Sequence, residues 1–182
     1  MKRIAVLLAD GFEEVEAVTP IDFLRRVGVQ VDVLGVTGER VSGGHGVAVQ
    51  ADALLGAYRT VPDGVVLPGG MPGAQNLADS AGAVSLLRVV AESDGLIAAI
   101  CASPAVVLAP NGFLSGRRAT CYPGFEDRFE ETVTFVEDRV VVDGNRITSR
   151  GPGTAAEYAV AIIRYLLGDA QAEEIRSKTL QP

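Results

Sequence analysis

The sequence predicts an α/β protein built on a mostly parallel sheet with helices on both faces. Short apolar runs, as at residues 3–9 and 64–67, are typical of strands that are buried on both faces. Segments with helical periodicity separate these runs, so that strands and helices alternate along the chain. The composition agrees, because 48% of the 182 residues are hydrophobic and 21 are glycine, which suits one globular domain with a sizeable core.

The first strand–helix–strand unit begins with the apolar run at residues 3–9. A turn follows, and residues 13–26 are predicted to form a helix with an acidic first turn, as the helix dipole favours. Gly28 ends this helix, and residues 29–35 form the second strand. The apolar positions that recur at helical spacing, which we expect to be buried, are Val15, Val18, Ile21, Phe23 and Leu24.

The remaining elements follow from the same patterns. Residues 38–46 are polar and rich in glycine, which predicts a hairpin or loop insertion before a short strand at 47–50. No Lys-Ser or Lys-Thr pair follows these glycines, so a phosphate-binding P-loop is not indicated. Further strands are expected at 64–67, 118–121, 133–136, 139–142 and 146–149, and helices at 81–93, 155–167 and 170–178.

The stretch 95–109 is expected to be the working centre. Its first half is a buried strand, and its second half is a helix with Pro104 in the first turn, where the missing N–H is harmless. Cys101 lies between the two, on a tight turn of the kind known as a nucleophile elbow. The positive end of the following helix favours thiolate over thiol. The alternative is that Cys101 is a small buried hydrophobe, as many free cysteines are.

Carboxylates and backbone amides are the groups available to assist this thiol. Glu16 has mostly uncharged helix neighbours, so we expect a raised pKa and a carboxyl group that donates a hydrogen bond to a thiolate. The adjacent glycines Gly69 and Gly70 let backbone N–H groups approach an oxyanion, although an ordinary turn explains them equally. We expect the loops 10–16, 68–73, 101–104 and 151–154 to meet at the carboxyl edge of the sheet.

Composition and sparse motifs exclude several functions. A net charge of −7 and a pI near 4.7 argue against nucleic acid or an anionic membrane as the main partner. The sole histidine, His45, is expected to be a loop residue, and a His/Cys metal cluster lacks ligands, so we expect neither metal nor cofactor. With two cysteines and no apolar run of the ~20 residues that span a bilayer, we expect a soluble cytoplasmic protein.

Four segments resemble motifs of the ThiJ/PfpI superfamily, in the branch of the parkinsonism-associated deglycase and its bacterial YajL-like relatives. They lie in order over nearly the whole chain: residues 9–16, 66–70 with 73–77, 96–102 and 148–154. The resemblance implies one ThiJ/PfpI-type (class I glutamine amidotransferase-like) domain over 1–182. It also implies a flavodoxin-like fold, a three-layer sandwich, and a homodimer.

The resemblance also assigns roles to residues. It makes Cys101 the reactive cysteine, Glu16 its protonated partner, and the backbone N–H groups of Gly69, Gly70 and Ala102 the oxyanion pocket. In addition, Arg26 matches a family arginine near the dimer interface and the site.

Three positions near the nucleophile set this chain apart within the superfamily. Ala102 stands where protease-like members carry His, which argues against a peptidase. Tyr122 stands where some members have a His, so a mechanism that requires that His is not expected. Ser103 replaces the usual Gly or Ala and adds a hydroxyl near the expected pocket mouth.

Two functions from different classes follow. The first is a cofactor-independent glyoxalase or protein deglycase, in which Cys101 attacks small 2-oxoaldehydes or glycated protein side chains and Glu16 moves the proton. The second is a redox-sensing protective protein or chaperone, in which Cys101 oxidises to a sulfinate that Glu16 stabilises. In that case Cys121 is either a resolving thiol or a core residue. A hydratase or hydrolase of another branch would need different acidic partners.

Overall fold

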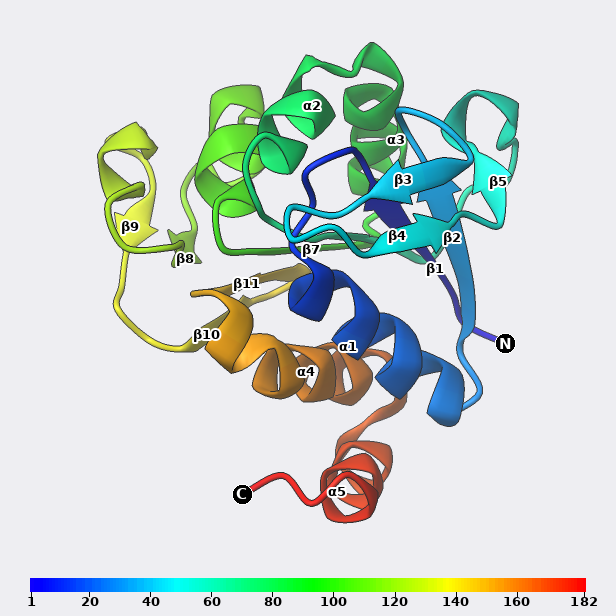
Figure 1. Ribbon diagram of the computed structural model, residues 1–182. Helices are drawn as coiled ribbons and strands as arrows, with labels where there is room; N and C mark the ends of the chain where they lie inside the picture. Colours follow the sequence, from blue (N-terminus) through cyan, green and yellow to red (C-terminus); the bar gives the residue numbers. More distant parts are fainter.

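A seven-stranded sheet forms the centre of the computed structural model, which describes residues 1–182 (Figure 1). The strand order is β10-β11-β7-β6-β1-β2-β5, and all neighbours are parallel except β10 and β11. The predicted mostly parallel sheet is therefore confirmed. The strands are β1 (Arg3–Leu8), β2 (Gln30–Gly35), β5 (Ala53–Leu54), β6 (Gly64–Leu67), β7 (Leu96–Ile100), β10 (Val140–Asp143) and β11 (Arg146–Ser149).

Helices cover both faces of this sheet, as Figure 1 shows. One layer holds α1 (Glu14–Arg26), α4 (Ala155–Leu167) and α5 (Asp169–Lys178), and the other holds α2 (Gly73–Asp79) and α3 (Ala81–Glu92). Successive residues of a strand point to opposite faces. Accordingly Ile4 and Val6 pack into the core on the α1 side, whereas Ala5 and Leu7 pack into the core on the α2 side. The strands are apolar throughout because both faces are buried.

Three predicted elements differ clearly from those observed, and one helix was not predicted. The segment after Cys101 is not a regular α-helix but a π-helical turn, Pro104–Leu108, followed by a 3-10 turn, Ala109–Asn111. Pro110 explains the change, because it has no N–H for the next helical hydrogen bond and its ring clashes with the preceding turn. Helix α2, which begins directly after the turn that holds Gly69 and Gly70, was not predicted. The expected strands at 118–121 and 133–136 shorten to β8 (Arg118–Ala119) and β9 (Thr134–Phe135), which pair with each other.

The glycine-rich insertion is the expected hairpin, made of β3 (Arg40–Ser42) and β4 (Ala48–Gln50). It lies beside the start of α1, where the Gly44 N–H donates to the Phe12 carbonyl at 2.8 Å. A Cβ atom on Gly43 would lie 2.4 Å from Oε1 of Glu14. Glycine at this position therefore permits the hairpin to approach the helix.

The buried face of α1 differs from the prediction at its first turns. Val15 and Val18 are 49% and 47% exposed, whereas Glu14 and Glu16 point inward. The prediction that Val15 and Val18 are buried is therefore wrong. Glu14 and Glu16 can be buried in their place because backbone N–H groups, described below, donate hydrogen bonds to their carboxylates. No helix of residues 1–182 combines the length and the apolar character that crossing a bilayer requires.

Candidate active site

Cys101 lies directly after β7, where the chain turns from strand into the irregular helical segment. Its φ angle is +65°, in the left-handed region that residues other than glycine rarely adopt. The backbone is held on both sides of this turn: the Cys101 N–H donates to the Ser149 carbonyl, and the Tyr122 N–H donates to the Cys101 carbonyl, both at 2.9 Å. This is the geometry of the predicted nucleophile elbow. The side chain is 8% exposed.

Glu16 reaches the same place from the first turn of α1 and is completely buried. Its Oε2 atom accepts a hydrogen bond from the Gly69 N–H at 2.8 Å, and the carboxyl group lies beside the Cys101 thiol, whose pKa it raises. Glu13 caps the helix, since its Oε2 atom accepts from the Glu16 N–H at 3.0 Å. The structure therefore brings the predicted thiol and carboxyl group together.

The two glycines after β6 have different roles. The N–H of Gly69 is engaged by Glu16, so its assignment to the oxyanion pocket is wrong. The N–H groups of Gly70 and Ala102 lower the pKa of the Cys101 thiol, as donors close to the sulfur do, and they are the pair that can hold an oxyanion. A Cβ atom on Gly69 would lie 2.6 Å from Cβ of Cys101 and 2.8 Å from Oε2 of Glu16, so only glycine fits.

Burial decides the protonation of this pair. It raises the pKa of Glu16 to about 7, against the lowering effect of the hydrogen bonds from Cys101 and Gly69. Burial and the negative charge of Glu16 raise the pKa of Cys101 to about 12, although the Gly70 and Ala102 N–H groups lower it. The raised pKa of Cys101 runs against the expectation that the end of the following helix favours a free thiolate. The pair loses one proton near neutrality and retains the second to high pH.

Two further predicted residues, Ser103 and Arg26, lie elsewhere than expected. The Ser103 hydroxyl is buried and donates to the Pro68 carbonyl at 2.6 Å, so it joins two loops and does not line the pocket mouth. Arg26 lies ten residues from Glu16, about 15 Å along α1, and pairs with Asp22 at 2.6 Å. Within one chain Arg26 therefore does not reach the site.

Tyr122 and Cys121 follow the site in the sequence. The Tyr122 ring is 44% exposed and lies against Gly151, where a Cβ atom would be 3.1 Å from the ring. It therefore covers the edge of the site and links the Gly151 loop to Cys101. Cys121 is a free thiol that is fully buried, and burial raises its pKa to about 12, which suits a core cysteine.

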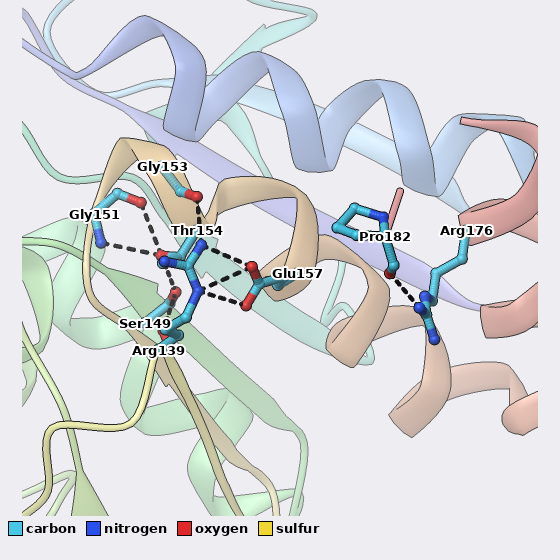
Figure 2. A network of polar contacts seen from close by, with 8 residues as sticks. All are labelled: Arg139, Ser149, Gly151, Gly153, Thr154, Glu157, Arg176 and Pro182. Atoms are coloured by element: carbon cyan, nitrogen blue, oxygen red, sulfur yellow. Dashed lines mark hydrogen bonds and ion pairs between the residues drawn. The ribbon is translucent and has the colours of Figure 1, made fainter. Parts of the chain in front are cut away.

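A polar network fixes the fourth loop, and sequence patterns did not reveal it (Figure 2). The hydroxyls of Ser149 and Thr154 lie 2.6 Å apart, and the Thr154 hydroxyl also donates to the Gly151 carbonyl at 2.8 Å. Arg139 donates to the Gly153 carbonyl and pairs with Glu157 at 2.7 Å. These contacts join the end of β11 to the start of α4. All four predicted loops thus meet at the carboxyl edge.

His45 and two acidic residues form a separate cluster at the hairpin. His45 Nδ1 lies 2.9 Å from Oε2 of Glu14 and 3.9 Å from Oε1 of Glu13, and these are the side chains in residues 1–182 grouped closely enough to hold a metal ion. Both carboxylates already have structural partners, because Glu13 caps α1 and Oε1 of Glu14 accepts from the His45 N–H at 2.7 Å. The cluster fastens the hairpin to α1.

Fold and site together define a class: a doubly wound α/β protein with a cysteine at its elbow and a buried carboxyl partner. Residues 2–165 match the DJ-1/PfpI family, and the chain belongs to that family. This confirms the resemblance found in the sequence motifs.

Individual relatives agree with this membership. The chain is 42% identical over 181 residues to the Parkinson disease protein 7 homolog of Danio rerio, covering 97% of this chain and 95% of the relative. It is 35% identical over 174 residues to the glutathione-independent glyoxalase DJR-1.2 of Caenorhabditis elegans, covering 94% and 92%. The oxidized DJ-1 of Toxoplasma gondii matches in structure with a TM-score of 0.95 at 42% identity, covering 99% and 98%. The chain spans 40% of the length of protein DJ-1 homolog B of Arabidopsis thaliana, at 39% identity.

Proposed function

We propose that this protein is a cofactor-independent glyoxalase or protein deglycase that acts on small 2-oxoaldehydes, or on their protein adducts, in protection against carbonyl stress. One observation carries the proposal: the buried Glu16 carboxyl group lies beside the Cys101 thiol, since a Cβ atom on Gly69 would lie within 2.8 Å of both side chains. The N–H groups of Gly70 and Ala102 lower the pKa of this thiol. This arrangement pairs a nucleophile with a proton acceptor and an oxyanion site. The similarity to a relative named as a glutathione-independent glyoxalase supports it.

The proton balance of the site suits the first half of this reaction. Ionised Glu16 takes the thiol proton as the sulfur of Cys101 attacks the aldehyde carbon, and the resulting alkoxide lies toward the N–H groups of Gly70 and Ala102. Glu16 then returns the proton to that oxygen, which gives a hemithioacetal. No proton leaves the site in this exchange.

The second half converts the hemithioacetal into product. Glu16 removes the proton from the former aldehyde carbon, which gives an enediol as the adjacent ketone oxygen takes up a proton. Glu16 then delivers its proton to the adjacent carbon, and the hydroxyl proton of the first carbon is released in exchange, which leaves a thioester on Cys101. Water hydrolyses the thioester and regenerates the thiol. Methylglyoxal and one water thus give lactate, and glyoxal gives glycolate.

The test is lactate production from methylglyoxal without glutathione by the wild-type protein, Cys101→Ala, Glu16→Gln and Cys121→Ala. We expect turnover in the wild-type protein and in Cys121→Ala, which removes the buried thiol that the mechanism does not use. Cys101→Ala and Glu16→Gln are expected to lose it. Turnover retained in Glu16→Gln would refute the assigned proton transfer, and turnover retained in Cys101→Ala would refute the nucleophile.

A redox role of the same site is the second candidate. The N–H groups that face the sulfur, and a Glu16 carboxyl group protonated below about pH 7, are donors for the oxygens of a Cys101 sulfinate. Intact mass after mild peroxide tests this role. A stable gain of two oxygens on Cys101 that Glu16→Gln abolishes supports it, whereas a bond to Cys121 contradicts it.

We further propose that the protein forms a homodimer through α1 and the neighbouring hairpin. Val15, Val18 and Val47 are each about half exposed, and the Val47 N–H donates to Oε1 of Glu14 at 3.3 Å, which places the hairpin beside the first turn of α1. Exposed apolar side chains gathered in this way are typical of an interface. A second copy is also what Arg26 needs to approach a site.

The two free cysteines suit a reducing compartment such as the cytoplasm.

A further inference from the structure

Four buried side-chain polar atoms have no hydrogen-bond partner, and two of them belong to the adjacent helices α1 and α4. One is Oε1 of Glu16, the carboxyl oxygen that Gly69 does not hold, and the other is the hydroxyl of Tyr158, a fully buried residue of α4. Polar atoms that are buried in a protein are almost always paired, directly or through water. Two unpaired atoms in one region therefore point to a link between them.

The arrangement of the helices brings Glu16 and Tyr158 into the same region of the core. Helices α1 and α4 lie side by side on one face of the sheet, and both start from its carboxyl edge (Figure 1). Glu16 is the third residue of α1 and Tyr158 the fourth of α4. Helical side chains lean toward the N-terminus, so both lean toward the edge that carries Cys101. Tyr158 shares a core cluster with Cys101, and burial, together with the nearby charge of Glu16, raises the Tyr158 pKa.

We propose that Tyr158 is a positioning residue for Glu16, and that its hydroxyl holds the Oε1 side of the carboxyl group through one internal water molecule. No direct hydrogen bond joins the two side chains, and two polar partners are the minimum that a buried water needs. Gly69 holds the other oxygen, so the two contacts together fix the carboxyl group toward Cys101. A phenylalanine would fill the same space without making this link.

This inference rests on the proposed proton exchange between Glu16 and Cys101 but not on the aldehyde substrate. Its test is therefore the rate at which iodoacetamide alkylates Cys101 as a function of pH, with the modified peptide identified by mass. In the wild-type protein we expect this rate to rise through about pH 7, as the pair loses its first proton. Glu16→Gln is expected to abolish that rise. The measurement remains informative if methylglyoxal is not turned over.

Tyr158→Phe removes only the hydroxyl and keeps the ring that fills the core. We expect it to move the rise in alkylation upward by about one pH unit, because the charged pair loses a hydrogen-bond partner. Tyr165→Phe is the matched control: it makes the same change on the same helix at a position that is 42% exposed. A rise at the same pH in Tyr158→Phe, Tyr165→Phe and the wild-type protein would overturn the proposal.

Thermal unfolding gives a second, independent measurement on the same variants. If the hydroxyl is linked to Glu16, Tyr158→Phe lowers the midpoint of unfolding relative to Tyr165→Phe, because a buried hydrogen bond is lost. If the hydroxyl has no partner, phenylalanine removes an uncompensated polar group and raises the midpoint. A raised midpoint overturns the proposal, as does an unchanged alkylation profile.

Discussion

Gly69→Ala is the substitution for which the geometry makes the sharpest prediction. The added Cβ atom would lie 2.6 Å from Cβ of Cys101, 2.8 Å from Oε2 of Glu16 and 3.0 Å from the Ala102 nitrogen. Two of these three atoms belong to the elbow, whose backbone is held by hydrogen bonds, so the Glu16 carboxyl group is the part that moves. Overpacking of this kind costs about 1–3 kcal/mol of stability. For a chain of this length, about 2 kcal/mol lowers the unfolding midpoint by roughly 4–8 °C.

Activity should suffer more than stability, because the displaced carboxyl group is the proton acceptor. A misplacement of about 1 Å at a reacting group costs about a hundredfold in rate. The assay is lactate production from methylglyoxal beside a thermal unfolding curve, with Gly56→Ala as the control. A Cβ atom on Gly56 would have no other atom within 4 Å, and the Gly56 backbone is not left-handed. If Gly69→Ala had the same rate of lactate production and the same unfolding midpoint as Gly56→Ala, the close packing around Gly69 would be refuted.

The other predictions concern single contacts. Ser103→Ala leaves the buried Pro68 carbonyl without its donor, and we expect a loss of about 1–3 kcal/mol in a denaturant titration, with Ser85→Ala, on α3, as the control. The pKa of Glu16 is about 7 in the folded protein against 4.5 in the unfolded chain, so its protonated form favours folding and this contribution disappears as pH rises from 4.5 to 7. As pH rises over that range, the free energy of unfolding of Glu16→Gln should therefore increase by up to about 3 kcal/mol relative to that of the wild-type protein. A difference that stays constant with pH would contradict the raised pKa. Val18→Asp, with Val142→Asp as an equally exposed control, is expected to yield monomers in sedimentation velocity if α1 forms the proposed interface.

The features that local patterns determine were predicted well. Strand Gly64–Leu67, strand Arg146–Ser149 and helix Ala155–Leu167 have the predicted bounds, because apolar runs and Gly168 mark them in the sequence. The elbow at Cys101 was also predictable, since a buried strand followed by Ala-Ser-Pro leaves few other conformations. For these elements short-range information is sufficient.

The features that the sequence did not predict depend on contacts between distant segments. Val15 and Val18 have the spacing of a buried face. However, the Gly69 N–H and the hairpin donate hydrogen bonds to the carboxylates of Glu16 and Glu14, so the helix buries these two residues and exposes the valines. The Ser103 hydroxyl is directed by the Pro68 carbonyl, 35 residues away. Tyr158 has the pattern of an ordinary core residue, and only the fold shows that its hydroxyl is buried on the helix that packs against α1. Neither partner of such a contact carries a signal of its own in the sequence.

The shift in the Cys101 pKa changes how the site is understood to work. A free thiolate would need only a positive environment, and any helix end supplies one. Here burial opposes the thiolate, and the sulfur becomes reactive only when Glu16 accepts its proton, so that nucleophile and base are a single unit with one negative charge. Attack on an aldehyde and oxidation to a sulfinate both begin with that proton transfer. The two candidate functions should therefore fail together in Glu16→Gln and share one pH dependence, and a protein in which only one of them followed Glu16 would require a second route to the thiolate.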